Sequence, residues 1–136
     1  MAFKRKKKFQ LDTLIDADMI IRGNTTLTGG IRLDGKIYGN LTVLDGQDGT
    51  LIMGENSVIK GNVIVPTAII GGKITGNIKC LDYLEVHSNA VINGDIQYNL
   101  IELHAGAKIN SRLKIMTKSE IKKETQTISK INKEEK

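Results

Sequence analysis

Residues Gly35–Leu41 read GKIYGNL, and the motif returns as GKITGNI at Gly72–Ile78. Five of the seven positions are identical, and the last exchanges Leu for Ile. A second pair, NSVIKGNV at Asn56–Val63 and NAVINGDI at Asn89–Ile96, shares the pattern of Ile, any residue, Gly, Asn or Asp, and an apolar residue. Similarity at a short, regular spacing is typical of repeat folds.

The isoleucine of this motif marks one position in each of six repeats. Successive copies are separated by 16, 22, 15, 18 and 17 residues, and the longest spacing contains a five-residue, turn-like insertion at 45–49. Apolar residues recur with a period of two before and after each isoleucine, which is the pattern of strands buried on one face. We expect these isoleucines to form a core ladder: Ile21, Ile37, Ile59, Ile74, Ile92 and Ile109.

This pattern predicts an all-β fold. Three short strands in a coil of about 17 residues cannot form a sheet alone, but stacked coils pair their strands in parallel. The sequence therefore predicts a single parallel β-helix, or β-solenoid, of about six coils with three short strands per coil. An aromatic content of 4% agrees, because a narrow core has little room for rings. The glycine of each motif and the Asn or Asp after it are expected at a corner.

Charge divides the chain into a head (1–10), a β-helix domain (11–116) and a tail (117–136). The net charge is +5, yet the head alone carries five basic residues and no acid, while residues 11–116 carry nine basic and eleven acidic residues. A mildly acidic body is a poor electrostatic surface for nucleic acid, so we do not expect nucleic-acid binding. We expect the charged tail to be disordered or transiently helical, with a weak capping box at Thr117 and Glu120.

The head contains both phenylalanines of the chain beside its main basic cluster. Rings and positive charge together favour peripheral binding to anionic lipid, over a merely solubilising head or non-specific nucleic-acid contact. No apolar run approaches the roughly 20 residues of a membrane-spanning helix, and no signal-peptide core follows the head. We therefore expect a cytoplasmic protein on the inner face of the cytoplasmic membrane. The predicted membrane-binding residues are Phe3, Lys4, Arg5, Lys6, Lys7, Lys8 and Phe9.

The ends of the predicted rod would expose an apolar cross-section and unpaired strand edges, which favours end-to-end polymerisation. The alternative is that residues 10–18 and part of the tail fold over as caps. The predicted interface residues are Leu11, Leu14, Ile15 and Met19 in the N-terminal coil, and Ile109, Leu113 and Ile115 in the C-terminal coil.

The sequence contains no phosphate-binding loop, nucleophile elbow or paired-cysteine metal motif. His87 and His104 are 17 residues apart, so they should stack on the outside beside Glu85 and Glu102. Such a ladder could bind a metal ion, but the sequence places no third ligand, and we expect a solvated surface. Cys80 is expected to be a small buried hydrophobe. We thus predict no catalytic residue, cofactor or metal, and no enzyme activity.

Two families share this kind of repeat. The segment GENSVIKG at Gly54–Gly61 resembles the hexapeptide acyltransferases, which implies an alternative: a left-handed β-helix trimer with acyltransferase-like activity. Such an enzyme needs a long projecting loop, and the insertion here has five residues. Residues 11–116 resemble the bactofilins more closely, from IIRGN at Ile20–Asn24 to the closing segment Leu103–Met116. In that segment Ile109 stands where the family usually has Phe, and Ser111 where it has Gly.

The resemblance to bactofilins implies a right-handed, roughly triangular β-helix that assembles into non-polar filaments without nucleotide. It also implies a cytoskeletal scaffold that organises cell-envelope or cell-shape machinery. The partners expected on this basis are the protein itself, an anionic membrane surface bound by the head, and peptidoglycan-modifying enzymes.

Overall fold

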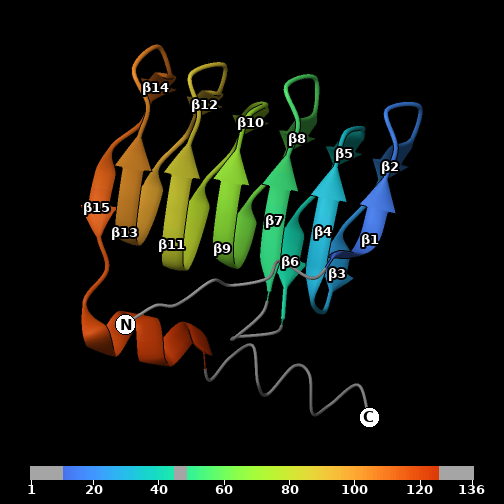
Figure 1. Cartoon of the computed structure of the whole chain (residues 1–136). Coiled ribbons are helices and arrows are strands. Elements are labelled where there is room, and N and C mark those ends of the chain that lie inside the picture. The colour runs from blue at the N-terminus through green and yellow to red at the C-terminus, as the bar shows by residue number, and fades with distance from the viewer. Residues whose placement is uncertain (1–10, 45–48, 126–136) are drawn as a thin grey trace, which may run out of the picture.

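The computed structural model describes residues 11–44 and 49–125, and it forms a parallel β-solenoid of about six coils (Figure 1). Every strand pair is parallel, and each coil adds one layer to two sheets. The strands lie side by side along the rod from β1 at one end to β15 at the other (Figure 1). The fold predicted from the repeat is therefore confirmed.

The first sheet has six strands and carries the isoleucine of the motif at its centre. Its strands are β2 (Ile20–Arg22), β5 (Lys36–Tyr38), β8 (Val58–Lys60), β10 (Lys73–Thr75), β12 (Val91–Asn93) and β14 (Lys108–Asn110). The six isoleucines are directly paired from Ile21 to Ile109, without any slip in register. The 22-residue spacing therefore does not disturb the ladder, because β6 and β7 flank the extra residues.

The second sheet has nine strands and folds around two sides of the rod. Its strands are β1 (Leu11–Ile15), β3 (Thr25–Leu27), β4 (Gly30–Leu33), β6 (Leu41–Val43), β7 (Thr50–Met53), β9 (Val63–Ile70), β11 (Ile78–Val86), β13 (Ile96–Leu103) and β15 (Leu113–Ile115). Two separate strands of an early coil, such as β3 and β4, correspond to one continuous strand in β9, β11 and β13. The corner between β3 and β4 contains Gly29 with a positive φ of 83°. At the equivalent place in a later coil, β11 continues through a register shift between Cys80 and Tyr83.

The core is a stack of aliphatic side chains. Ile37, Ile59, Ile74 and Ile92 are completely buried, and apolar residues from the second sheet face them. Cys80 is also fully buried within this stack, as expected from the sequence. Burial raises the pKa of the Cys80 thiol to about 12, so this thiol stays protonated at neutral pH.

The corner after the first sheet is built by glycine and asparagine. Gly61 has a φ of 157°, and a Cβ at this position would collide with the carbonyl oxygen of Gly39 one coil earlier. The neighbouring Asn62 accepts the backbone N–H of Asn77 through Oδ1 at 2.9 Å. Equivalent bonds join Asn24 to Asn40, Asn40 to Asn62, and Asn77 to Asp95. Side-chain bonds thus reinforce the backbone ladder along this edge.

The described part of the tail is helical from 118 to 125. Thr117 and Glu120 form a reciprocal capping box: the Thr117 N–H donates to Glu120 Oε1 at 2.9 Å, and the Glu120 N–H donates to Thr117 Oγ1 at 3.1 Å. Met116 and Ile121 pack on Leu44, Ile64 and Leu81 outside the rod. The helix is thus more ordered than the predicted tail. No described helix is long and apolar enough to cross a membrane.

Candidate functional site

The solenoid has two open ends, each formed by strands that pair on one side only within the described residues. At the N-terminal end these strands are β1, β2 and β3, which pair with β4, β5 and β6. At the C-terminal end they are β14, β15 and the second half of β13. Unpaired N–H and C=O groups at such edges can continue the ladder into another chain.

The C-terminal end exposes side chains that belong to the core columns. Ile115 continues the inward column of Tyr98 and Cys80, and Leu113 continues that of Ile96 and Ile78. Because no coil follows them in the described chain, Ile115 is 61% exposed and Leu113 is 43% exposed. Leu103, which pairs with the fully buried Val86, is likewise 45% exposed. An apolar cross-section is therefore open to solvent.

The N-terminal end exposes apolar side chains, some of which point into the rod and some outward. Leu11, Met19 and Ile20 are about half exposed. Leu14 pairs with Arg32, whose side chain faces outward, so it lies on the flank of the rod. Ile21 and Leu27 face inward and are only partly buried because no coil precedes them in the described chain. This end also offers apolar surface beside an unpaired strand edge.

The C-terminal helix lies along the side of the rod and leaves the C-terminal end uncovered (Figure 1). Lys79 in β11 holds Glu124 of this helix by an ion pair of 2.8 Å, and Lys114 in β15 contacts Glu120 at 3.3 Å. The predicted alternative of a tail folded over as a cap is therefore absent from the part of the tail that is described.

A family model for polymer-forming cytoskeletal proteins, the bactofilins, matches residues 13–114. The chain belongs to the bactofilin family. Two curated bactofilins from Myxococcus xanthus are similar to it. BacP is 28% identical over 102 residues, which are 75% of this chain and 41% of BacP. BacO is 22% identical over 111 residues, which are 82% of this chain and 85% of BacO.

A solved structure, a cryo-EM reconstruction of Thermus thermophilus bactofilin double helical filaments, shares the fold. Its TM-score is 0.65 at 18% identity, and the match covers 76% of this chain and 99% of that chain. The fold of a bactofilin is thus present here. Because this chain spans about two fifths of BacP, whatever BacP does as a whole protein is not transferred to it.

The sequence-predicted interface residues of this bactofilin take different places in the two end coils. Leu11, Met19, Leu113 and Ile115 are exposed at the ends, and Ile109 is partly buried. Ile15 is only 3% exposed, because β4 covers it, so it belongs to the core and not to the open surface.

Sequence reasoning missed three exposed apolar residues at the ends: Ile20, Leu100 and Leu103. Leu103 could have been found, because it is the last member of a predicted apolar column. Ile20 and Leu100 face outward and do not belong to any apolar column of the repeat. The predicted membrane-binding residues Phe3 to Phe9 lie outside the described residues.

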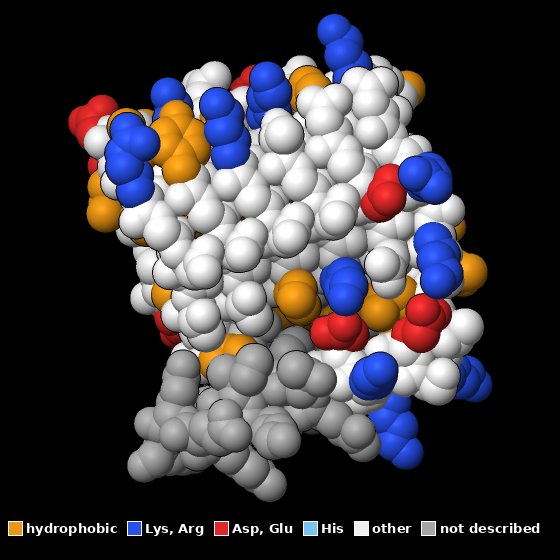
Figure 2. All heavy atoms as spheres, turned by 180° about the vertical axis from the view of Figure 1, so that it is seen from behind, with side chains coloured by type: hydrophobic (Ala, Val, Ile, Leu, Met, Phe, Trp, Pro, Cys, Tyr) orange, Lys and Arg blue, Asp and Glu red, His pale blue; other side chains and the backbone are white. Residues whose placement is uncertain are grey.

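The bactofilin rod also has one basic face, which the net charge of residues 11–116 conceals. The charged side chains on the six strands of the first sheet are all basic: Arg22, Lys36, Lys60, Lys73 and Lys108. Tyr38 lies between two of them, with Arg22 Cζ 5.2 Å and Lys60 Nζ 5.4 Å from its ring centroid. Lys and Arg side chains gather along one edge of the view in Figure 2.

Proposed function

We propose that this chain is a cytoskeletal scaffold whose solenoids stack end to end into filaments. The observation that carries the proposal is the open C-terminal end, where core-column residues Leu103, Leu113 and Ile115 face solvent beside unpaired strand edges. Stacking a second rod there continues the hydrogen-bond ladder and removes this apolar surface from water. Membership of a polymer-forming family supports the same assignment.

The proposed filament is non-polar and forms without nucleotide, and the coil is right-handed; these three features follow from family resemblance. In a non-polar filament like ends meet, so one contact joins two C-terminal ends and a second joins two N-terminal ends. Loss of one contact then leaves dimers held by the other. A head-to-tail filament would instead fall apart into monomers.

Negative-stain electron microscopy and pelleting of the full chain test the proposal. We expect filaments without added nucleotide, above a critical concentration. Monodisperse monomers at high protein concentration would overturn the proposal. A discrete trimer by light scattering would instead favour the acyltransferase-like alternative, in which three β-helices build sites between subunits.

Membrane attachment is the second part of the proposal. The head supplies five basic residues and two phenylalanines, and the basic face of the first sheet can lie toward the same anionic surface. Each basic group near an anionic membrane contributes about 1 kcal/mol, and a filament multiplies a weak attachment through avidity. The filament would then lie on the cytoplasmic side of the membrane and position cell-envelope machinery.

Co-sedimentation with vesicles tests this attachment. We expect filaments to pellet with vesicles containing anionic lipid and not with neutral ones, and a chain lacking residues 1–9 to lose most of this binding. Unchanged binding after that deletion would show that the head is not the membrane anchor. For the proposed peptidoglycan-modifying partners, a pull-down with and without residues 117–136 tests whether the tail recruits them.

A further inference from the structure

Both histidines of the chain lie together on the outer surface, near the C-terminal end of the rod. His87 follows β11 and His104 follows β13, and the backbone ladder places them one above the other. Their rings stack with centroids 4.7 Å apart and an interplanar angle of 26°. Two residues before each histidine, Glu85 and Glu102 are directly paired and also face outward.

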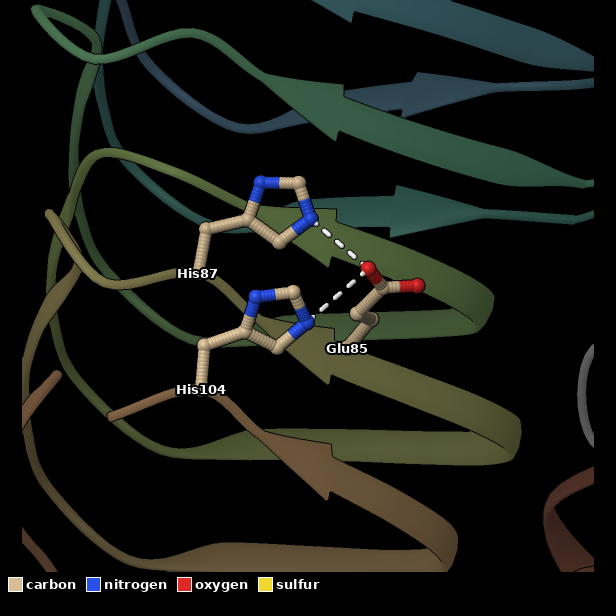
Figure 3. Close-up of side chains that lie close together, drawn as sticks. All are labelled: Glu85, His87 and His104. Atoms are coloured by element: carbon tan, nitrogen blue, oxygen red, sulfur yellow. Dashed lines mark hydrogen bonds and ion pairs between the residues drawn. The ribbon is translucent and has the colours of Figure 1, made fainter.

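The four side chains converge through the same ring nitrogen of each histidine. Glu85 Oε2 lies 2.8 Å from His87 Nε2 and 3.2 Å from His104 Nε2. Glu102 Oε2 lies 3.0 Å from His104 Nε2. Figure 3 shows both imidazoles turned toward the carboxylate of Glu85. The potential ligand atoms of Glu85, His87 and His104 all lie within 4.8 Å of one another. Glu85 is therefore the third candidate ligand, which the sequence could not place.

A tyrosine holds the two carboxylates from behind. Tyr83 Oη lies 3.0 Å from Glu85 Oε1 and 3.2 Å from Glu102 Oε1. Tyr83 thus orients the carboxylate of Glu85, as an outer hydrogen-bond partner usually does for a metal-binding carboxylate.

The cluster is specific to the last coils and is not a product of the repeat. The same two outward columns carry Arg32 and Asp34 in an early coil, which form a 2.9 Å ion pair. In the coils between, these columns carry Ile52 with Gly54 and Ile69 with Gly71. The two glycines leave a hollow of about 360 Å³ beside His87, so a ligand can reach the cluster from solvent.

We propose that Glu85, His87 and His104 bind a divalent transition-metal ion of the zinc class, with Glu102 as the fourth ligand. Two imidazoles and carboxylates suit Zn²⁺, and four protein ligands make a closed, structural site. The ion would join β11 to β13, which belong to adjacent coils. It would therefore clamp the last complete layers of the rod next to the open C-terminal end. This inference does not depend on filament formation.

Calorimetric titration of the untagged full chain with Zn²⁺, after treatment with a chelator, tests the proposal. We expect one Zn²⁺ per chain and a higher thermal unfolding midpoint with the metal, because an ion that binds only the folded state stabilises it. The double variant His87→Gln/His104→Gln should lose saturable binding. Tyr83→Phe should keep the stoichiometry but weaken binding by roughly 10-fold, as removal of an outer partner does.

Asp34→Asn is the matched control, because it removes a carboxylate from the same outward column without touching the histidines. We expect it to bind Zn²⁺ as the wild type does. Circular dichroism shows whether each variant is folded, and Glu85→Gln provides a second ligand variant if the double variant is not. Zinc binding that is absent from the wild type, or equal in the wild type and a folded ligand variant, would overturn the proposal and leave an ion-pair ladder.

Discussion

Replacing Ile115 by aspartate tests whether the C-terminal end forms a filament contact. Ile115 is 61% exposed and lies in the last strand of the rod, where it continues the inward-facing column of Tyr98 and Cys80. Full burial of an isoleucine stabilises by about 1.5–3 kcal/mol, so covering the exposed part of this side chain contributes about 1–2 kcal/mol to the contact. A conservative change and a charged change should therefore differ widely in effect.

Ile115→Ala removes most of this apolar contribution, about 1 kcal/mol, which raises the critical concentration roughly 5-fold. Ile115→Asp adds the cost of burying a charge, which is several kcal/mol, so the critical concentration should rise by about 1,000-fold or more. If like ends meet, two introduced carboxylates face each other and add repulsion. Neither change should much affect folding of the single rod, because the side chain is already largely in water.

Pelleting across a concentration series measures these effects, and sedimentation velocity identifies what remains in solution. The control is Thr75→Asp, which places the same charge on an exposed position of β10 in the middle of the rod. We expect the control to polymerise like the wild type and Ile115→Asp to stay in solution. A wild-type critical concentration for Ile115→Asp would refute the assignment of this end as a contact. Dimers of this variant would indicate a remaining N-terminal contact.

Gly61→Ala should destabilise the rod by on the order of 3 kcal/mol, because its Cβ meets the carbonyl of Gly39 at a positive φ; an unchanged thermal midpoint would contradict this. Thr117→Ala should cost the helix at 118–125 about 1 kcal/mol in amide-exchange protection, whereas Thr117→Ser should retain it. Hydrogen bonds from Thr117 lower the pKa of Glu120. The cap therefore contributes its full stability above the ordinary pKa of glutamate, and this stability is lost as the pH falls through the lowered pKa of the folded chain. Burial raises the pKa of Cys80 to about 12, so a thiol reagent at pH 8 should label the folded chain only as fast as it unfolds; rapid labelling without denaturant would argue against a buried thiol.

The core of the fold was predictable because it repeats. Ile37 and Ile74 lie in nearly identical heptapeptides, and both are completely buried and separated in the sheet only by Ile59. Stacking of like residues in parallel coils turns a sequence period directly into a spatial column. The five-residue insertion left the columns intact, so aligning the coils on the motif was sufficient to predict which residues stack.

The ends of the rod were less predictable. A sequence repeat predicts how one coil packs between two others, and an end coil has a neighbour on one side only. Ile15 is apolar in the first strand, yet β4 buries it, whereas Leu14 beside it is exposed on the flank. The strand period distinguishes the two only after the register with β4 is known. The helix after Met116 was expected only as a transient one, because Ile121 packs on a cluster that contains Leu44 and Leu81, which are distant in sequence.

The His–Glu cluster shows the same limit in a different form. The 17-residue spacing predicted that His87 and His104 stack, but it could not show that Glu85 turns one carboxylate oxygen toward both rings. The Glu85 carboxylate is also held by Tyr83, whose Oη lies 3.0 Å from Glu85 Oε1. The repeat thus predicts which residues stack, but the direction of each side chain depends on neighbours that the repeat does not specify.

The corner after the first sheet has longer hydrogen bonds in the last coil than in the coil before it. The corner bond from the Gly76 N–H to the Asn93 carbonyl is 2.8 Å, but the next bond, from Gly94 to Asn110, is 3.3 Å. The adjoining side-chain bond also lengthens, from 3.0 Å at Asp95 to 3.4 Å at Arg112. Ser111 occupies the corner in this coil, where the earlier coils have glycine, and its Cβ must be accommodated between layers. A partner rod that pairs with the free edge of this coil would support the weakened corner, so the open end and the corner both favour assembly at the C-terminal end.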